Sequence, residues 1–242
     1  SRLWMGSPKR RTYTGIVFAP GKELSERFLN LWKGFSVEPP TADEQATPEA
    51  QAALDAWIEH LEKNVCGGDL SLSRWLTGYF AHLIQHPGVK PLVSIVLRGQ
   101  KGTGKNALID CIGELIKRHY IVTEDDRFLV GNFNGHLEAN LLLMLDEAAW
   151  PGDKKAEGAL KGLITSPTRL IERKFLEAYT VQNYTRVVIL GNEDWLVPAT
   201  EDERRFAVFD VGTGRMQDRA FFRQMCVGME RGGYQLLLPY LL

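Results

Sequence analysis

Apolar residues follow two patterns along this chain, and the first is a set of short buried-strand runs. Residues 92–97, 141–145 and 186–190 are apolar runs rich in leucine, isoleucine and valine. Runs of this length and composition are typical of strands buried on both faces of a parallel sheet. From Lys90 onward such runs alternate with helical segments, which predicts an α/β fold with a mostly parallel central sheet.

The second pattern is helical spacing ahead of that region. Thr47 is placed to cap a helix with Pro48 at its first position, and Gly67-Gly68 ends it. A second helix begins near Asp69 or Ser71 and stops before Pro87. The predicted apolar faces are Leu54, Trp57, Ile58, Leu61 and Val65 in the first helix, and Leu72, Trp75, Leu76, Tyr79, Phe80, Leu83 and Ile84 in the second. We interpret the aromatic residues as core.

The chain divides into three zones on these patterns. Residues 1–46 form a lead-in segment, irregular or short-stranded, with a basic cluster at Lys9-Arg10-Arg11. Residues 47–89 form a small helical region, and residues 90–242 form the α/β core. The apolar ending at 236–242 leads us to expect a domain cut from a longer polypeptide.

Composition narrows the class of protein. With 242 residues, 44% hydrophobic and 24% charged, the chain can form one sizeable core plus a small accessory region. Its net charge is −1, so any nucleic-acid binding must depend on local basic patches. Cys66, Cys111 and Cys226 lack metal-ligand spacing, which fits reduced thiols in a cytoplasm. No apolar run of membrane-spanning length and no secretion signal occurs in the sequence, so we expect no membrane partner.

The first candidate site follows the run 92–97. Residues Gly99-Gln100-Lys101-Gly102-Thr103-Gly104-Lys105-Asn106 have the spacing of a phosphate-binding P-loop. Glycines let the backbone aim N–H groups at an anion, and the positive end of the next helix points at the same place. Lys105 is predicted to reach the β- and γ-phosphates. The alternative is a glycine-rich turn that binds nothing.

Asn106 departs from this motif, which expects serine or threonine. An amide oxygen is a suitable hard ligand for Mg²⁺, directly or through water, so the site is altered and not necessarily abolished. The helix that follows has an apolar face made of Leu108, Cys111, Ile112, Leu115 and Ile116.

A pair of carboxylates ends the second apolar run. Asp146 and Glu147 form a Walker B arrangement, in which the first acid holds Mg²⁺ and the second polarises the attacking water. Because binding alone does not require Glu147, the pair favours hydrolysis. The alternative is an acidic helix start, which the helix dipole favours in any case.

The third apolar run ends in Gly191-Asn192-Glu193. At the tip of a strand near the other two sites, Asn192 is a candidate to orient the lytic water or to contact the γ-phosphate. Asparagine after a strand is also common in turns and caps, which is the alternative.

The ordered set of motifs resembles the superfamily 3 helicases, the AAA+-type ATPases of small DNA viruses, phages and plasmids. More narrowly, the chain resembles the helicase domain of phage and mobile-element primase-helicases related to the poxvirus helicase-primase. The resemblance rests on motif A at 99–106, motif B at 143–147, motif B′ from Ala159 to Lys174, motif C at 187–192 and the stretch 202–206. It extends through the lead-in pieces 15–21 and 30–35. It implies an AAA+-like P-loop ATPase fold.

The resemblance implies a DNA-gripping hairpin in motif B′. Residues 169–173 and 179–184 are its candidate strands, and Lys174 beside Arg173 near the tip is the candidate DNA contact. Lysine and arginine at such a tip neutralise phosphates without reading sequence. The alternative is a solvated charged loop, since Glu172 and Glu177 flank the pair.

The resemblance also implies an arginine that reaches the neighbouring subunit's nucleotide. Arg205, just before the apolar strand 206–209, is the candidate, with Arg204 as its substitute. A guanidinium stabilises charge on a transferring phosphoryl group. The alternative is a surface ion pair with Asp202 or Glu203.

Together these expectations describe an ATP- and Mg²⁺-dependent DNA helicase motor. Lys105, Glu147, Asn192 and Arg205 are its candidate catalytic residues, and Asn106 and Asp146 its candidate metal ligands. The resemblance implies a homo-oligomeric ring, a hexamer, on single-stranded DNA, with residues 47–89 as a collar or packing platform. It also implies a primase or polymerase domain in the same polypeptide and, for a phage protein, the host cell cytoplasm. The rival functions are a P-loop kinase of a small molecule and a nucleotide-binding assembly module with weak hydrolysis.

Overall fold

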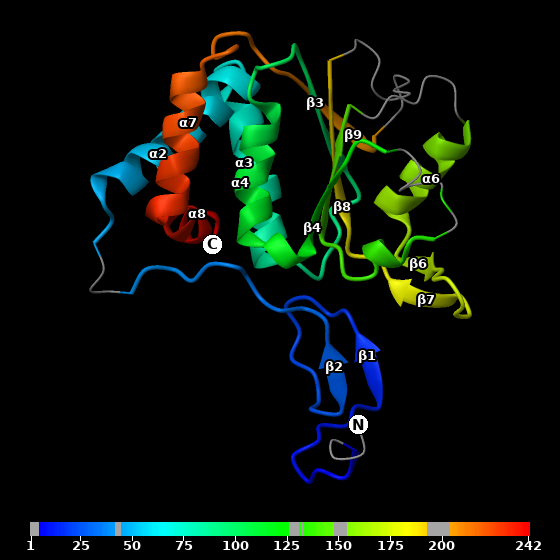
Figure 1. Ribbon diagram of the computed structural model, residues 1–242. Coiled ribbons are helices and arrows are strands. Elements are labelled where there is room, and N and C mark those ends of the chain that lie inside the picture. Colours follow the sequence, from blue (N-terminus) through cyan, green and yellow to red (C-terminus); the bar gives the residue numbers. More distant parts are fainter. Residues whose placement is uncertain (1–4, 42–44, 126–130, 132, 148–153, 193–203) are drawn as a thin grey trace.

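The computed structural model describes residues 5–41, 45–125, 131, 133–147, 154–192 and 204–242 (Figure 1). Its strands are β1 (Gly15–Val17), β2 (Phe28–Asn30), β3 (Ser94–Arg98), β4 (Tyr120–Thr123), β5 (Leu142–Asp146), β6 (Thr168–Ile171), β7 (Tyr179–Gln182), β8 (Arg186–Gly191) and β9 (Phe206–Asp210). Its α-helices are α2 (Pro48–Glu59), α3 (Leu70–Gln85), α4 (Lys105–Leu115), α6 (Lys154–Thr165), α7 (Arg219–Gly228) and α8 (Tyr234–Leu241). The shorter helical turns are η1 (His60–Val65), η2 (Lys117–His119), η3 (Gly135–Leu137) and η4 (Met229–Gly233).

A five-stranded sheet with the order β4-β5-β8-β3-β9 forms the centre of the molecule, and every neighbouring pair in it is parallel. The predicted α/β fold with a parallel central sheet is therefore confirmed. The run 92–97 becomes a strand only from Ser94, because Leu92 has a φ of 59° and cannot continue an extended ladder.

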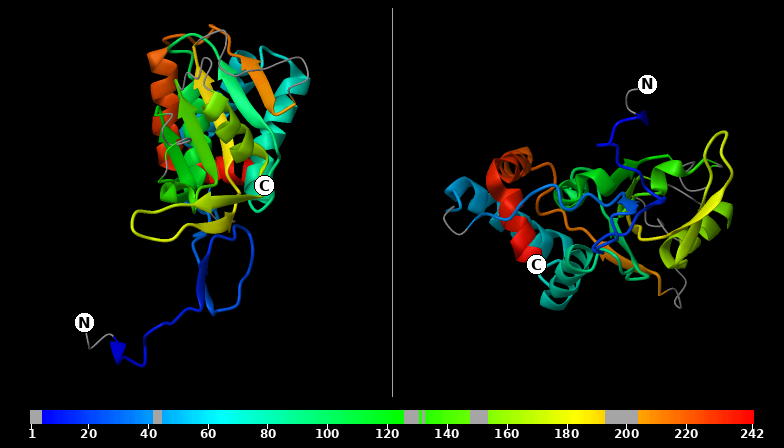
Figure 2. Two further views of the ribbon diagram at one scale, coloured as in Figure 1. Left: turned by 90° about the vertical axis from the view of Figure 1, so that its right-hand side faces the viewer. Right: turned by 90° about the horizontal axis from the view of Figure 1, so that it is seen from below.

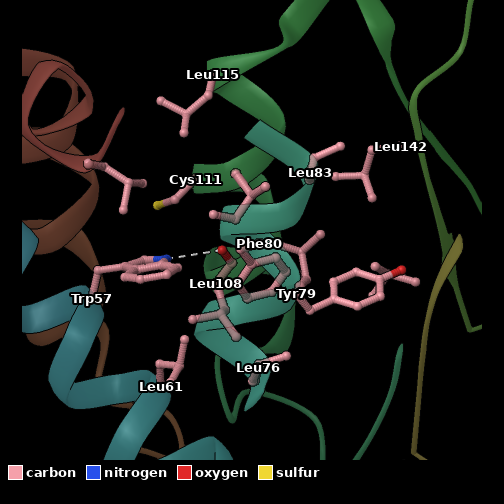
Figure 3. Packing of buried hydrophobic residues seen from close by; sticks show 14 of the residues in the cluster. Trp57, Leu61, Leu76, Tyr79, Phe80, Leu83, Leu108, Cys111, Leu115 and Leu142 are labelled. Carbon is pink, nitrogen blue, oxygen red and sulfur yellow. Dashed lines mark hydrogen bonds between the residues drawn. The ribbon is translucent and has the colours of Figure 1, made fainter. Parts of the chain in front are cut away.

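Alternate residues of the central strands enter two separate hydrophobic clusters, one on each face of the sheet. Met144 and Val188 pack with α2, α3, α4, α7 and α8 on one face, whereas Leu145 and Ile189 pack with α6 on the other (Figure 1). Figure 3 shows part of the larger cluster, where Trp57, Phe80 and Leu108 meet from three helices. Burial on both faces explains why these strands are continuous apolar runs.

Both predicted helix starts are confirmed. The Thr47 hydroxyl accepts the Ala50 N–H at 3.1 Å, and the Asp69 carboxylate accepts the N–H groups of Ser71 and Leu72 at 2.7 and 3.0 Å. The first helix ends as expected at Gly67, but its last turn, η1, is π-helical.

Two positions of the predicted core are wrong. Leu72 and Trp75 of α3 are 46% and 44% exposed. The Trp75 ring stacks on Tyr79 at 5.8 Å between centroids and lies 6.0 Å from Phe209 of β9. Because β9 is the edge strand, no further layer among the described residues covers this side of α3.

The lead-in segment is short-stranded, as predicted. Strands β1 and β2 pair in parallel, and the Asn30 side chain joins them to the next turn through the backbone of Ala19. Trp32 stacks on His119 of the core at 4.8 Å, and the Lys33 N–H donates to His119 Nε2. Figures 1 and 2 show this segment at the same end of the sheet as β6 and β7.

Among the described residues, no helix combines the length and the apolar character that crossing a membrane requires.

A cluster of cations, one buried and two half-buried, lies at the amino end of β8. The Lys90 ammonium donates to the carbonyl oxygens of Leu163 and Ser166, which closes the end of α6. Arg186 is buried and donates to the carbonyl oxygens of His86 and Val89. Burial, and then the charges of Arg169 and Arg186, lower the pKa of Lys90 to about 7. The folded chain therefore loses the Lys90 proton at a pH where the unfolded chain still holds it.

This shift predicts a pH-dependent stability difference between the protein and its Lys90→Met variant. Between about pH 7 and 10 the unfolded chain binds more protons at Lys90, so the wild-type free energy of unfolding rises with pH relative to the variant. Below pH 7 both states hold the proton and the difference stays constant. Urea denaturation of both proteins at pH 6, 7.5 and 9 measures this difference in the free energy of unfolding. Lys63→Met, at a side chain 72% exposed, controls for the loss of one charge, and a difference that is flat from pH 6 to 9 contradicts the prediction.

Candidate functional site

Three sequence motifs meet at the carboxyl edge of the sheet. Strand β8 lies between β5 and β3, and the register pairs Asp146 with Leu190 and Arg98 with Gly191. The Gly99 N–H donates to the Gly191 carbonyl at 3.1 Å, which ties the 99–106 loop to the end of β8. The carboxyl ends of adjacent parallel strands are where α/β folds bind ligands.

A cavity of about 850 Å³ opens at this edge. It is lined by Lys101, Gly102, Thr103, Gly104, Lys105, Asn106, Ala107, Glu124, Asp146, Glu147, Asn192, Gln217, Arg219 and Phe222. The fold therefore brings the predicted loop, carboxylate pair and asparagine around one space. Gly99 and Gln100 do not line it, but their carbonyl oxygens hold the Lys105 side chain.

Lys105 is the first residue of α4 and is only 5% exposed. Its ammonium donates to the carbonyl oxygens of Gly99 and Gln100, the latter at 3.0 Å, and to Asn192 Oδ1 at 2.9 Å. Burial lowers the pKa of Lys105, and the nearby carboxylates of Asp146 and Glu147 oppose that effect. The cation is thus held at the cavity by neutral acceptors that an anionic ligand can replace.

Asn192 joins Lys105 to Glu147. Its Oδ1 accepts from Lys105, and its Nδ2 donates to Glu147 Oε1 at 3.1 Å. Glu147 has a φ of 50°, in the left-handed region that glycine favours, and its N–H donates to the Leu190 carbonyl at 3.0 Å. Residues held in such strained backbone conformations cluster at functional sites.

Asn106 lies one residue further along α4 and donates from its Nδ2 to Asp146 Oδ2. Both side chains line the cavity, and Asp146 carries the carboxylate oxygens that Mg²⁺ prefers. Asn106 can add its Oδ1 to the same ion once its amide turns, because Nδ2 now faces Asp146. No three His, Cys, Asp or Glu side chains gather as a metal-binding group in the part of the chain that the structure describes. The set therefore fits a metal ion that receives its other ligands from phosphate and water, as Mg²⁺ commonly does.

Five residues of the cavity wall were not predicted from the sequence, namely Ala107, Glu124, Gln217, Arg219 and Phe222. Glu124 directly follows β4, and the pairing of Thr123 with Leu145 places it beside Asp146. Its position after an apolar strand was an available signal. Gln217, Arg219 and Phe222 come from the segment that begins α7, and only tertiary packing brings them here. The Gln217 N–H donates to the Gly102 carbonyl at 2.8 Å, which ties this segment to the loop.

The glycines of the loop satisfy both backbone and space requirements. Gly102 and Gly104 have φ values of 83° and 86°. A Cβ at Gly104 would lie 2.2 Å from the Phe222 ring and 2.8 Å from His60 Nε2. The loop can therefore approach these side chains only without a side chain of its own.

The predicted hairpin is present and lies at the opposite end of the sheet. β6 and β7 pair antiparallel, from Thr168 with Gln182 to Ile171 with Tyr179, somewhat shorter than the predicted strands. Lys174 lies in the exposed tip, 5.5 Å from the Phe133 ring centroid. Arg173 instead pairs with Glu138, so its charge is engaged within the chain. Phe175 is fully exposed at the same tip.

Arg205 lies far from the cavity of its own chain. Its carbonyl accepts the N–H of Ser94, the first residue of β3, whereas the 99–106 loop follows the last. Five residues of strand separate the two ends, roughly 16 Å. Arg204 and Arg205 instead line a second cavity of about 400 Å³ with Leu92, Val93 and Thr165. Their suggested partners Asp202 and Glu203 lie outside the described residues.

Comparison with known proteins supports the fold. A model described as a family of unknown function (DUF5906) matches residues 97–205. A DNA primase-polymerase of Nitratiruptor phage NrS-1 is 29% identical over 207 residues, which cover 82% of this chain and 27% of the phage protein. A solved apo structure of the NrS-1 C-terminal region superposes with a TM-score of 0.72 at 20% identity, covering 94% of this chain and 54% of that one.

A structure of JCV helicase bound to a small acetamide compound matches more distantly, with a TM-score of 0.50 at 16% identity over 83% of this chain and 56% of that one. The α/β fold is thus shared with a helicase and with part of a phage replication protein. This chain spans about a quarter of the curated relative and about half of each solved region.

The close contacts around Gly104 predict that adding a single methyl group there destabilises the fold. Gly104→Ala combines an unfavourable positive φ with a clash against Phe222, and should lower the free energy of unfolding by about 1–3 kcal/mol. Gly78→Ala is the matched control, since it lies within α3 with no atom near its added Cβ and should be neutral or slightly stabilising. Urea denaturation compares the two; equal stability of both variants contradicts the geometry.

Proposed function

We propose that this chain is the ATP-hydrolysing motor domain of a DNA helicase that acts in replication. The observation that carries the proposal is the connected set Lys105, Asn192 and Glu147, which lines one cavity together with Asp146. A lysine for phosphate, a carboxylate for the metal and a second carboxylate linked to an amide are the groups that nucleoside triphosphate hydrolysis needs. The fold shared with a helicase supports the same reading.

In this proposal the backbone N–H groups of residues 101–105 bind the phosphates, and Lys105 moves from the carbonyls of its own loop to the β- and γ-phosphate oxygens. Asp146 and Asn106 hold Mg²⁺, which when bound neutralises charge on the phosphates. Glu147 accepts a proton from the attacking water, and Asn192 keeps its carboxylate in position. In this proposal the hydrogen bond from Asn192 therefore contributes to hydrolysis by orienting the Glu147 carboxylate.

The β6–β7 hairpin is the proposed contact with single-stranded DNA. Lys174 supplies an exposed cation, and Phe175 supplies an exposed ring on which a base can stack. Arg173 can bind phosphate only if it leaves Glu138, so we assign it the smaller role. Because β8 runs from the hairpin base at Arg186 to Gly191 beside Asn192, one strand connects the two proposed sites.

The position of Arg205 supports a ring in which each nucleotide site is shared. An arginine at the amino end of the sheet cannot reach Lys105 of its own chain, whereas a neighbouring copy can present it. We propose a homo-oligomeric ring, a hexamer by resemblance, with residues 47–89 as its collar. The primase-polymerase relative favours a polymerase or primase domain in the same polypeptide and, for a phage protein, the host cytoplasm.

Mixed rings test the shared site. Lys105→Ala and Arg205→Ala should each lower the ATPase rate by about a hundredfold or more. In mixtures of the two variants some interfaces pair an intact Lys105 with an intact Arg205, so partial activity should return. Solution mass is measured on every sample as the control for assembly. If both variants assemble and no mixture regains activity, the shared site is wrong.

DNA dependence tests the motor. Single-stranded DNA should raise the ATPase rate, and Lys174→Ala should weaken DNA binding about three- to tenfold while lowering the salt slope by roughly 0.7, as expected for one phosphate contact. Lys22→Ala, at an exposed lysine of the lead-in segment, is the matched control and should change neither.

Two results of the same assay favour the rival functions. Slow turnover that DNA does not stimulate indicates a nucleotide-binding assembly module. A phosphorylated small-molecule product without any DNA effect indicates a kinase.

A further inference from the structure

The helical region donates three hydrogen bonds to the loop and helix that form the cavity. Trp57, His60 and Asn64 lie along one side of α2 and η1 and are 0%, 1% and 3% exposed. Trp57 Nε1 donates to the Leu108 carbonyl at 3.1 Å, the bond drawn in Figure 3. Asn64 Nδ2 donates to the Thr103 carbonyl at 3.1 Å, and His60 Nε2 lies 3.2 Å from the Gly104 carbonyl. None of these three side chains lines the cavity itself.

The contact with Gly104 fixes the state of the His60 ring. A carbonyl oxygen only accepts, so His60 Nε2 must carry a proton and donate it. Burial lowers the pKa of His60, which keeps the ring neutral and leaves Nδ1 without a proton. Nδ1 is buried and has no partner among the described residues. A buried nitrogen without a hydrogen-bond partner destabilises the fold, and an apolar side chain at position 60 would not have this penalty. The hydrogen bond that Nε2 donates is therefore what histidine offers here and an apolar residue does not.

Peptide geometry gives these two bonds a consequence at the cavity. The Thr103 carbonyl and the Gly104 N–H belong to one peptide group and point in opposite directions, as do the Gly104 carbonyl and the Lys105 N–H. The Thr103 carbonyl is held by Asn64, and the Gly104 carbonyl is held by His60 together with the Leu108 N–H of α4 at 3.2 Å. These bonds turn the N–H groups of Gly104 and Lys105 away from η1. Gly104 and Lys105 both line the cavity.

The π-helical turn makes the arrangement possible. In η1 the Cys66 N–H donates to the Leu61 carbonyl, five residues back, and this wider turn places His60 and Asn64 toward the same loop. Asn64 also binds the segment that leads to α7, because its backbone carbonyl accepts the Gly212 N–H at 2.7 Å. Asn64 thus binds both the cavity loop and the segment that leads to α7.

We propose that His60 and Asn64 are positioning residues for nucleotide binding, which act by orienting the Gly104 and Lys105 N–H groups toward the phosphates. This inference rests on the proposed function, and it gives the helical region a role within the nucleotide site. Oriented backbone N–H groups at a helix start bind anions without further adjustment. Loss of either side-chain donor should therefore weaken phosphate binding more than it weakens the fold.

Two replacements of His60 separate the donor from the rest of the ring. Gln Nε2 stands the same number of bonds from Cα as His Nε2, whereas Asn Nδ2 stands in the place of Nδ1. His60→Gln should bind Mg²⁺-ATP within about twofold of wild type, and His60→Asn about tenfold more weakly, the effect of one lost bond to an ordered group. Isothermal calorimetry with Mg²⁺-ATP and with inorganic pyrophosphate measures both. Asn64→Ser, which leaves His60 intact, should also weaken binding about tenfold.

A second readout needs no nucleotide. In protein labelled with ¹⁵N at glycine and lysine, the Gly104 and Lys105 amide signals should stay near their wild-type positions in His60→Gln and shift in His60→Asn. Without ligand, the melting temperatures of the two variants should differ proportionally less than their affinities for Mg²⁺-ATP do.

Each failure has a separate meaning. Wild-type protein that binds neither ligand overturns the proposed function and the phosphate role together. Wild-type protein that binds while His60→Asn and Asn64→Ser bind equally well overturns the positioning role alone.

Discussion

The parallel ladder of β5, β8 and β3 is the constraint on which the rest of the structure depends. Parallel strands place their carboxyl ends at one edge, so the residues that follow them must meet there. In this chain those residues are Asp146, Asn192 and the loop that begins at Gly99. A different strand order would separate the lysine from the carboxylates, whatever the motifs themselves contained. The same ladder sends Arg205 to the opposite edge, which is why a complete site in our proposal requires a second copy.

The helices that cover the sheet bring segments from distant parts of the chain to one site. Strands buried on both faces need helices on both faces, and here α2 and α3 from before the sheet pack with α7 and α8 from after it. The helices on this face also contribute polar groups, since the stripe of Trp57, His60 and Asn64 donates to the cavity loop and the start of α4. In our proposal, nucleotide binding and helical packing therefore depend on the same residues, so a substitution that changes the packing also changes the binding.

Much of this arrangement could be predicted from local patterns. Apolar runs identified the strands, and Thr47 and Asp69 identified the helix starts. Motif spacing identified the cavity residues 101–106, Asp146, Glu147 and Asn192. The errors occurred at residues whose burial or hydrogen bonding depends on their spatial neighbours. Leu72 and Trp75 follow the helical period yet lie exposed at the sheet edge, and the donors at His60 and Asn64 gave no signal because a buried polar residue is recognised only by its partner. The roles proposed for the cavity and hairpin residues stay predictions.

The sequence by itself determined the elements and the chemistry that each carries, because hydrophobic period, caps and glycine-rich turns act over a few residues. Only the tertiary structure decided which side chains lie next to one another. It linked Lys105 to Glu147 through Asn192, engaged Arg173 with Glu138 and left Lys174 exposed. It also added Glu124, Arg219 and Phe222 to the cavity wall. These outcomes depend on which strands are adjacent and which helices share a face, and no local stretch of sequence contains that information.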